Sequence, residues 1–209
     1  MTLKSKICGI TTSEILKYII NHKYPAELLG FIINYKKSSR YVGIEILKKL
    51  IDIDKKNSKY VAVLVKPDHE ILEKIKDLNF DFYQIYDCDP NKIKFIKNKY
   101  NKKIITAITI KNREDVSRYK NFREFSDIIL FDGPGYEKSV SFNHQLLDTV
   151  PGNICKMVAG NIQFDDDIDK FKKICNYIDI SGGIETSGVK DISKIDIFLN
   201  KVKKANDEN

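Results

Sequence analysis

KICGITTSEILKYIINH, residues 6–22, joins a short apolar stretch to an amphipathic one through a glycine turn. KICGI has the length and composition of a buried strand, and SEILKYIINH those of a helix with one apolar face. A strand that leads into a helix is the repeating unit of a parallel sheet covered by helices. The turn CGITTSE does not match G-x-G-x-x-G, the phosphate turn of dinucleotide-binding open sheets. The stretch therefore favours a barrel over an open doubly wound sheet.

The same unit repeats along the chain, and no Pro/Gly/Ser-rich linker interrupts it. Seven further strand candidates follow KICGI, at residues 27–33, 60–65, 80–86, 103–110, 126–132, 154–160 and 177–183. Helix candidates alternate with them, at residues 13–22, 42–51, 68–78, 91–100, 113–120, 143–150, 164–174 and 192–205. Eight such units close a (β/α)₈ barrel, and 209 residues is near the lower limit for that fold. We predict an α/β fold, a (β/α)₈ TIM barrel, with residues 1–209 as a single domain.

The composition excludes several classes of protein. With 42% hydrophobic and 31% charged residues, the chain suits a folded protein with a core. No apolar run approaches the roughly 20 residues of a membrane span, and the amino terminus lacks a signal-peptide pattern. The four cysteines show no C-x-x-C spacing and no histidine-rich company, so neither a zinc site nor a disulfide framework is indicated. We predict a cytoplasmic protein with no membrane partner and no metal.

The charge pattern bears on the kind of partner. Lysine and arginine number 36, aspartate and glutamate 29, and the formal net charge is +7. A basic chain could bind nucleic acid, but these lysines are spread among acidic residues and form no basic arm. A mild positive field also helps to capture a small anion. We therefore predict a small anionic substrate and no nucleic acid, with a basic nucleic-acid-binding module as the alternative from another class.

Two glycine turns end the last strands, AGN at residues 159–161 and SGG at residues 181–183. In a barrel the chemistry collects at the carboxyl ends of the strands, and phosphate commonly binds near the seventh and eighth. Glycine lets backbone N–H groups approach a phosphate, and a helix start after the turn would add positive potential. Either turn alone is more simply a chain reversal. Together they favour a phosphorylated ligand held by Gly160, Asn161, Ser181, Gly182 and Gly183.

Three ionisable side chains lie at or near strand ends on the same predicted edge: Cys8, Asp132 and Asp179. An aspartate there commonly caps a turn or a helix, and a buried cysteine is commonly a small apolar residue. The functional interpretation is a carboxyl group at the mouth of a low-dielectric barrel, with a pKa raised enough to donate a proton near neutral pH. A thiol acts as a base only where its surroundings favour the thiolate, as a nearby lysine would. Both interpretations stay open on this evidence.

Arg40 ends the polar loop NYKKSSR, residues 34–40, and is one of only four arginines. A solvated loop arginine is the plain interpretation. The functional one is a fork-shaped partner for a carboxylate, which lysine imitates poorly. Because the chain uses lysine much more often than arginine elsewhere, the arginine here gives weak support to a role in binding a carboxylate. Gln84 and Tyr86 end the fourth strand candidate at the same edge.

Seven motifs, taken together, resemble a known family. KICGIT, GFI…KKSSRYV, VAVLVK, YQIYD, ILFDG…SF, MVAGNI and IDISGGIETSGVKDISKI occur in this order. The set resembles the phosphoribosylanthranilate isomerases of tryptophan biosynthesis, over nearly the whole chain from Lys6 to about Phe198. The opening motif and the closing D-x-S-x-G-x-E-x-x-G-x-K-D are its specific parts.

The resemblance implies a TIM barrel that uses no cofactor and no metal and acts on a small phosphorylated substrate, as a monomer or homodimer. The implied reaction is an Amadori rearrangement of N-(5'-phosphoribosyl)anthranilate to 1-(2-carboxyphenylamino)-1-deoxyribulose 5-phosphate. Carried over by position, the family's general base falls on Cys8 and its general acid on Asp132. The implied substrate contacts are Gln84, Arg40 for the carboxylate, Asp179 for the bridging amine, and Gly160, Asn161, Ser181, Gly182 and Gly183 for the phosphate.

The sequence departs from the family pattern in the loops around these positions. Lys36 stands where the family usually has proline, in a loop that is one residue longer, and Tyr86 replaces the histidine of Q-L-H-G. After Asp132, GPGYEKSVS at residues 133–141 replaces a glycine-rich segment, although Phe142 keeps its spacing. The turns read G-N and S-G-G where the family has G-G and S-S-G. Both proton-transfer positions match.

Related barrels are the alternatives within enzymes. The aminoimidazole carboxamide ribotide isomerase of histidine biosynthesis also catalyses an Amadori rearrangement, but its family has an aspartate where this chain has Cys8. Indole-glycerol-phosphate synthase would require a catalytic lysine motif and a longer amino terminus, neither of which is evident. A barrel that has lost catalysis is a further alternative, against which the presence of both proton-transfer residues argues.

Overall fold

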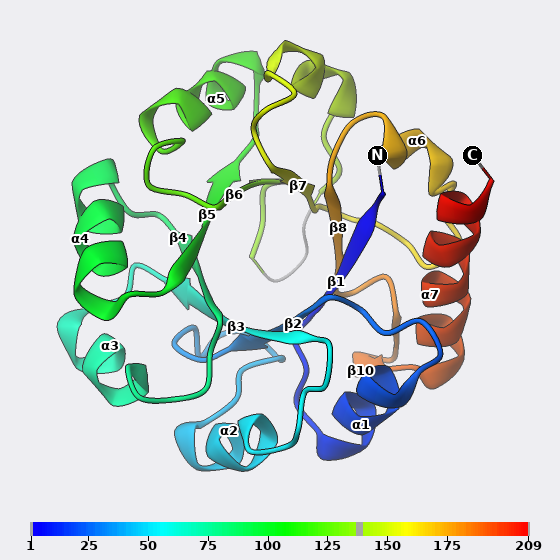
Figure 1. The fold of residues 1–209 in the computed structure, drawn as a ribbon, viewed down its shortest axis with the longest axis horizontal. Coiled ribbons are helices and arrows are strands. Elements are labelled where there is room, and N and C mark those ends of the chain that lie inside the picture. Colours follow the sequence, from blue (N-terminus) through cyan, green and yellow to red (C-terminus); the bar gives the residue numbers. More distant parts are fainter. Residues whose placement is uncertain (1, 137–139, 209) are drawn as a thin grey trace.

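Within residues 2–136 and 140–208, which this computed structural model describes, eight parallel strands close into a barrel (Figure 1). They are β1 (Lys4–Cys8), β2 (Leu28–Ile32), β3 (Lys59–Val65), β4 (Phe82–Tyr86), β5 (Lys103–Thr109), β6 (Ile128–Asp132), β7 (Lys156–Val158) and β8 (Tyr177–Ile180). Each strand pairs with the next along the chain, and β8 closes the ring on β1. The predicted (β/α)₈ TIM barrel is confirmed, and an open doubly wound sheet is excluded. That residues 1–209 form a single domain stays a prediction.

Helices surround the strands (Figure 1). In the described part of the chain they are α1 (Ser13–Asn21), α2 (Ile44–Ile51), α3 (His69–Ile75), α4 (Pro90–Tyr100), α5 (Arg113–Ser117), the 3₁₀ turns η1 (Arg118–Asn121) and η2 (His144–Thr149), α6 (Asp169–Lys172) and α7 (Ile192–Asp207). Six of them begin where a side chain accepts a hydrogen bond from a first-turn N–H group, namely at Thr12, Asp68, Asp89, Asn112, Asn143 and Asp191. Such capping explains why the short polar segments between strands and helices end where they do.

Three helices of the second half are less α-helical than predicted. Of the helices expected at residues 113–120, 143–150 and 164–174, the first changes to a 3₁₀ turn, the second is 3₁₀ throughout, and the third is α-helical only over α6. Before α6, Asp166 and Asp167 accept hydrogen bonds from the backbone N–H groups of Gln163 and Asp169. These local turns compete with helical hydrogen bonds, and the extent predicted for the helix at residues 164–174 was wrong for that reason.

Alternation along the strands separates two packed layers. One layer fills the barrel interior with Cys8, Leu28, Val61, Val63, Phe82, Tyr86, Ile105, Ala107, Ile128, Leu130, Met157 and Ala159. The alternate side chains, such as Leu29, Tyr60 and Tyr83, pack outward in the core that also contains the apolar residues of the helices. The interior is therefore a packed core. A polar side chain buried in it needs a hydrogen bond or an ion pair with its neighbours, because burial of an unpaired polar group is costly in free energy.

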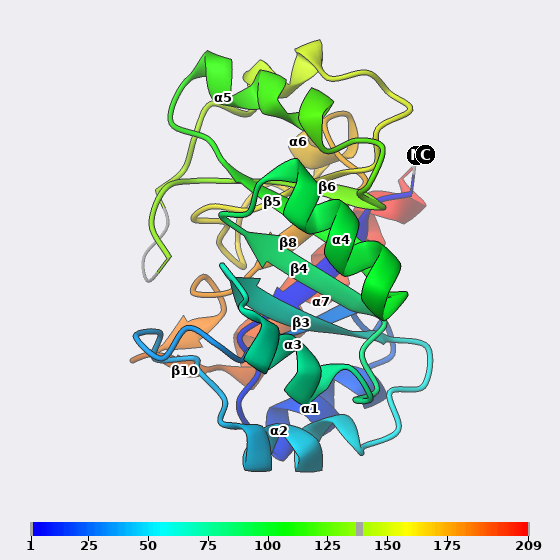
Figure 2. The same ribbon diagram turned by 90° about the vertical axis from the view of Figure 1, so that its left-hand side faces the viewer.

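A short hairpin that was not predicted follows β8. Strand β9 (Glu185–Thr186) pairs antiparallel with β10 (Val189–Lys190). Ser187 and Gly188 between them both have positive φ, 52° and 80°, as a tight hairpin turn requires. In Figure 2 the hairpin extends on the side toward which the arrowheads of β3 and β4 point, which is the carboxyl-end face.

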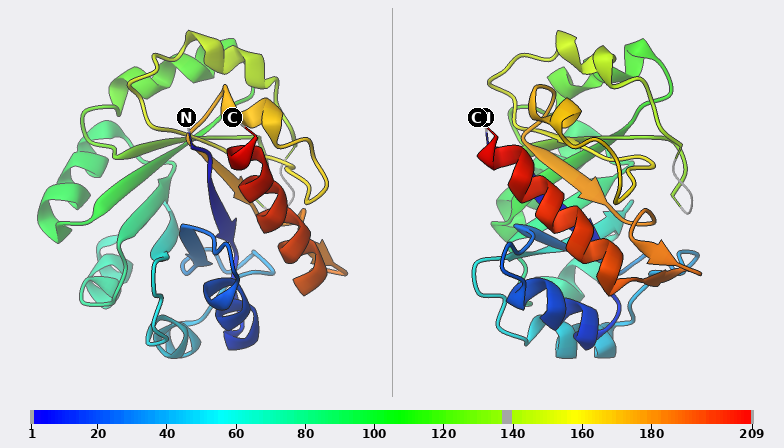
Figure 3. Two further views of the ribbon diagram at one scale, coloured as in Figure 1. Left: turned by 45° about the vertical axis from the view of Figure 1, so that its right-hand side comes forward. Right: turned by 90° about the vertical axis from the view of Figure 1, so that its right-hand side faces the viewer.

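The two ends of the chain lie together at the opposite face (Figure 2 and Figure 3). Asn206 in α7 donates through Nδ2 to the carbonyl of Leu3 at 2.8 Å and accepts from the N–H of Leu3 at 2.9 Å. The last helix is thereby tied to the chain just before β1. Within the described residues, no helix is both long enough and apolar enough to cross a membrane. Residues 137–139, in the unusual loop GPGYEKSVS, lie outside the described residues.

Candidate active site

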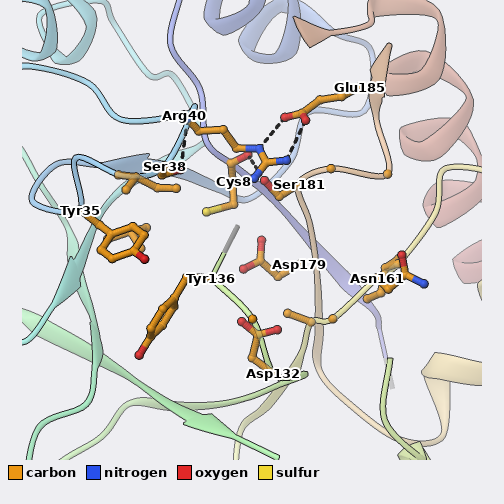
Figure 4. Close-up of a pocket in the computed structure, with 18 of the residues that line it drawn as sticks. Cys8, Tyr35, Ser38, Arg40, Asp132, Tyr136, Asn161, Asp179, Ser181 and Glu185 are labelled. Atoms are coloured by element: carbon orange, nitrogen blue, oxygen red, sulfur yellow. Dashed lines mark hydrogen bonds and ion pairs between the residues drawn. The ribbon is translucent and has the colours of Figure 1, made fainter. Parts of the chain in front are cut away.

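A cavity of about 470 Å³ opens at the carboxyl ends of the strands (Figure 4). It is lined by all but one of the residues that the sequence predicts for the site, namely Cys8, Arg40, Asp132, Gly160, Asn161, Asp179, Ser181, Gly182 and Gly183. The remaining one, Gln84, is fully buried on β4 and hydrogen-bonds Tyr86, which does line the cavity. Its predicted contact with substrate stays a prediction. Among the described residues, no group of three or more His, Cys, Asp or Glu side chains could hold a metal ion.

Lys6 and Cys8 both enter the barrel interior from β1, because residues two apart on a strand face the same side. A Cβ on Gly30 of β2 would lie 3.0 Å from Cys8 Sγ and 3.1 Å from Lys6 Nζ, so this glycine leaves room for both atoms. Burial raises the pKa of the Cys8 thiol, and the charge of Lys6 opposes that rise. Burial thus favours the neutral thiol of Cys8, and the ammonium group of Lys6 beside it favours the thiolate.

Lys6 and Asp179 form a buried ion pair beneath the cavity. Lys6 Nζ donates to Asp179 Oδ2 at 2.7 Å, and the parallel register of β1 and β8 places the two residues opposite each other. Burial raises the pKa of Asp179, against the effect of Lys6. Burial alone would lower the pKa of Lys6, but Asp179 and Cys8 outweigh it and the pKa is raised. Asp179 Oδ1 is buried with no hydrogen-bond partner in the described part of the chain, so it can accept one from a ligand.

Asp132 is the last residue of β6, where its carboxyl group meets the cavity. Burial raises its pKa from 3.8 to about 7, although a hydrogen bond from Tyr86 opposes the rise. The Tyr86 hydroxyl donates to Asp132 Oδ2 at 2.8 Å, while Oδ1 is buried with no partner among the described residues. A carboxyl group that titrates near pH 7 is well suited to donate a proton in a reaction.

Arg40 is held by a protein carboxylate, that of Glu185 in the unpredicted hairpin (Figure 4). Its Nε lies 2.6 Å from Glu185 Oε1 and its Nη2 2.7 Å from Oε2, a two-pronged pairing. Lys190 Nζ also contacts Oε1, at 2.7 Å. Burial would raise the pKa of Glu185, but Arg40 and Lys190 outweigh it, and the pKa is lowered. Glu185 therefore fixes the guanidinium at the cavity wall; the role predicted for Arg40 toward a substrate carboxylate stays a prediction.

The two glycine turns lie side by side. Gly183 pairs with Gln163, and a Cβ on Gly183 would lie 2.0 Å from the carbonyl oxygen of Ile162. Gly160 has φ +101°, and Asn161 takes the left-handed conformation with φ 56°, which asparagine tolerates. The expected helix start after each turn is wrong, because the hairpin precedes α7 and polar turns precede α6. Backbone N–H groups and the nearby cations, rather than a helix end, would have to attract a phosphate here.

Sequence reasoning did not assign roles to Lys6, Tyr86, Glu185 or Lys190. Lys6 could have been found from the strand period, since it precedes Cys8 by two residues and must share its face. Glu185 and Lys190 are fixed positions of the closing motif, so the motif could have indicated that both have a role at the site. Tyr86 was noted as a departure from the family pattern, but its hydrogen bond to Asp132 joins β4 to β6, and no local pattern reports it.

Residues 5–201 match the family model described as N-(5'-phosphoribosyl)anthranilate isomerase. The chain belongs to the phosphoribosylanthranilate isomerase family. The isomerase of Rhizobium johnstonii is 31% identical over 96% of this chain and 94% of its own length. The crystal structure of the Thermotoga maritima isomerase is 25% identical and covers 97% of this chain and 99% of that one, with a TM-score of 0.83.

A further isomerase structure shares the fold, with a TM-score of 0.81 at 24% identity over 97% of this chain and 99% of that one. It is a complex with reduced 1-(o-carboxyphenylamino)-1-deoxyribulose 5-phosphate. The predicted family is thus confirmed for this chain, and with it the predicted class of enzyme, an isomerase of tryptophan biosynthesis.

Proposed function

We propose that this isomerase converts N-(5'-phosphoribosyl)anthranilate into 1-(2-carboxyphenylamino)-1-deoxyribulose 5-phosphate, with Asp132 as general acid and Cys8 as general base. One observation carries the proposal. A carboxyl group with a pKa of about 7, a thiol beside an ammonium group, an arginine and two glycine turns all line the same cavity. An aldose-to-ketose rearrangement of a phosphorylated sugar amine needs this combination of groups.

The acid step opens the sugar ring. Protonated Asp132 gives its proton to the furanose ring oxygen, the bond between that oxygen and C1 breaks, and the nitrogen lone pair forms a C1=N double bond. Asp132 is left as a carboxylate, which Tyr86 still hydrogen-bonds. The raised pKa of Asp132 means that a substantial fraction of the enzyme holds this proton near neutral pH.

The base step moves hydrogen within the substrate. For this step the Cys8 thiol first loses its own proton. The resulting thiolate takes the proton from C2, the electrons of that bond move toward the C1=N group, and an enolamine forms. The enolamine then tautomerises to the ketone, so that C1 is reduced and C2 oxidised with no outside electron acceptor. Lys6 supports the thiolate through its charge, which offsets part of the cost of ionising a buried thiol.

The two ends of the substrate carry anions. Among the residues that line the cavity, Arg40 offers a cation, and the two glycine turns offer backbone N–H groups. We assign the phosphate to the turns at residues 159–161 and 181–183, and the anthranilate carboxylate to Arg40, which Glu185 orients. We assign Asp179 Oδ1, which is buried and has no partner among the described residues, as the acceptor for the bridging amine. The absence of a cofactor, a monomeric or homodimeric state and a cytoplasmic location stay predictions.

The decisive experiment follows the loss of anthranilate-type fluorescence when purified protein is given phosphoribosylanthranilate. Cys8→Ser and Asp132→Asn are each expected to reduce turnover by roughly 10²–10⁴-fold, the usual contribution of a general acid or base. Cys155→Ser is the matched control, because Cys155 lies outside the cavity. Circular dichroism and thermal melting check that the variants fold.

An inactive wild-type protein would refute the proposed reaction, and conversion of the histidine-pathway aminoaldose instead would favour the related isomerase. Full activity of Cys8→Ser or Asp132→Asn would remove that residue from the mechanism.

A further inference from the structure

Three polar side chains form a directed chain of hydrogen bonds inside the barrel. Gln84 Nε2 lies 3.1 Å from the Tyr86 oxygen, and that hydroxyl lies 2.8 Å from Asp132 Oδ2. All three residues are buried, with Gln84 wholly excluded from solvent. Burial in this interior leaves these side chains few alternative partners. The direction of each hydrogen bond therefore determines which oxygen of Tyr86 or Asp132 carries a hydrogen.

The donors settle the direction. An amide NH₂ group can only donate, so the Tyr86 oxygen accepts from Gln84, and the hydrogen of the hydroxyl points to Asp132. Burial beside Asp132 and Asp179 raises the pKa of Tyr86 well above its usual value, so the hydroxyl keeps its hydrogen. Asp132 Oδ2 therefore acts as an acceptor in both protonation states of the carboxyl group.

The other carboxyl oxygen of Asp132, Oδ1, does not share the contact with Tyr86. Oδ1 is buried and has no hydrogen-bond partner in the part of the chain that the structure describes. In a protonated carboxyl group the carbonyl oxygen accepts a hydrogen bond better than the hydroxyl oxygen, so the bond from Tyr86 favours Oδ2 as the carbonyl oxygen. The acidic proton of Asp132 thus belongs on Oδ1.

The ring of Tyr86 is fixed as well as its hydroxyl. It packs edge-on against Tyr136 with ring centroids 5.6 Å apart, and Tyr136 packs against Tyr35 at 5.3 Å. These contacts join the loop after β2 to the loop after β6 across one side of the cavity, where Figure 4 shows Tyr35 and Tyr136 close together. A change from tyrosine to phenylalanine at position 86 removes the donor and leaves this packing in place.

We propose that Tyr86 is a positioning residue for the general acid: it holds Asp132 by Oδ2 and so directs the transferable proton to Oδ1, with Gln84 fixing the direction of the Tyr86 hydroxyl. This inference rests on the proposed function of Asp132 and adds to it the oxygen that carries the proton. In this proposal Tyr86 orients the general acid. Gln84 acts through Tyr86 and does not contact the substrate itself.

The test compares Tyr86→Phe with wild type in kcat, KM and the pH profile of kcat/KM. We expect kcat to fall roughly tenfold to a hundredfold, the effect of losing a hydrogen bond to a charged group, while KM stays within about threefold. The profile limb that belongs to Asp132, near pH 7 in wild type, should move to higher pH, because the lost bond favoured the carboxylate. Lys6 and Cys8 on β1, Asp179 on β8, Tyr136 in the loop after β6 and Arg118 in η1 are unchanged in this variant, so the shift reports the lost bond.

Tyr83→Phe is the matched control. Tyr83 lies on the same strand, is also buried and donates its hydroxyl to the carbonyl of Ile75 at 3.3 Å, but it faces the outer layer. This variant should keep the wild-type kcat and pH profile, which shows that loss of a buried hydroxyl alone does not produce the effect. Gln84→Leu should move the same limb in the same direction as Tyr86→Phe, by a smaller amount.

The outcomes separate the two proposals. If wild-type protein converts the substrate and Tyr86→Phe shows an unchanged profile, the positioning role is refuted while the proposed function stands. A downward shift of the limb would also refute it, because that result means that Asp132 donates to Tyr86. An inactive wild-type protein would refute the proposed function itself.

Discussion

Lys6 Nζ lies 2.7 Å from Asp179 Oδ2 inside the barrel, where the side chain of Lys6 is wholly buried and that of Asp179 is 5% exposed. The two residues are far apart in the sequence and meet because β8 closes the ring on β1. The attraction between two buried ions offsets the free energy lost on removing them from water only when they lie close together and form further hydrogen bonds. Cys8 lies beside this pair, so an ion pair that joins the first and last strands also sets the charge next to the proposed base.

Replacement of Lys6 should therefore affect stability and catalysis together. Lys6→Met leaves Asp179 buried without its cation, and we expect the free energy of unfolding to fall by about 3–5 kcal/mol. Urea unfolding measures this, with Lys4→Met on the exposed part of the same strand as control. The double variant Lys6→Met/Asp179→Asn should recover much of the stability, since neither charge remains, and should stay inactive. A double variant no more stable than Lys6→Met would show that the ion pair is not the source of the loss.

Asp132 should make the protein less stable as the pH rises. Burial raises its pKa from 3.8 to about 7, so the folded state binds this proton more tightly than the unfolded state. The resulting stability is fully present below about pH 4 and is lost as the pH rises through 7, by roughly 4 kcal/mol at most. Asp132→Asn keeps an oxygen for Tyr86 and cannot ionise, so it should lack this decline and be the more stable protein at pH 8.

The measurement is the free energy of unfolding of wild type and Asp132→Asn at pH 5 and at pH 8. The difference between the two proteins isolates Asp132 from the other titrating groups. An equal pH dependence in both would contradict a raised pKa at this position.

Arg40→Lys tests recognition of the substrate carboxylate. Lysine keeps the charge but cannot form the two-pronged contact, and Glu185 would retain Lys190 as a partner. We expect kcat/KM to fall about tenfold to a hundredfold, mostly through KM, because this contact is made in the ground state as well as in the transition state. Arg113→Lys, on the exposed start of α5, is the control. A fall in kcat alone would instead place Arg40 in the chemical step.

Gly183→Ala tests the phosphate turns. A methyl group there would lie 2.0 Å from the Ile162 carbonyl oxygen, so the turn after β8 and the segment after β7 must separate. We expect KM to rise at least about tenfold and stability to fall by about 1–3 kcal/mol, as in other overpacked positions. Gly152→Ala has open space around its Cβ and serves as control. Inhibition by inorganic phosphate should weaken in parallel; an unchanged inhibition constant would place the phosphate elsewhere.

Much of the fold was accessible from local patterns, because strands and helices leave a periodicity in the sequence. The eight strands lie where β-branched runs predicted them, with bounds shifted by a few residues, as at β1 and β7. The α-helices after β5, β6 and β7 were overpredicted. After β7, the side chains of Asp166 and Asp167 satisfy backbone groups locally and so compete with the helix. The two-residue strands of the hairpin are too short to leave a pattern.

By itself, the sequence determined the barrel, the edge at which chemistry occurs, and the identity of Cys8, Arg40, Asp132 and Asp179 as residues at that edge. It could do so because strand ends in a closed parallel sheet all face one way. Only the tertiary structure decided which groups touch: Lys6 with Asp179, Tyr86 with Asp132, and Glu185 with Arg40. Those contacts depend on the register between strands and on how the loops fold over the cavity. Burial in the folded barrel raises the pKa of Asp132 to about 7, against the hydrogen bond from Tyr86, and the fold places a cation next to the Cys8 thiol.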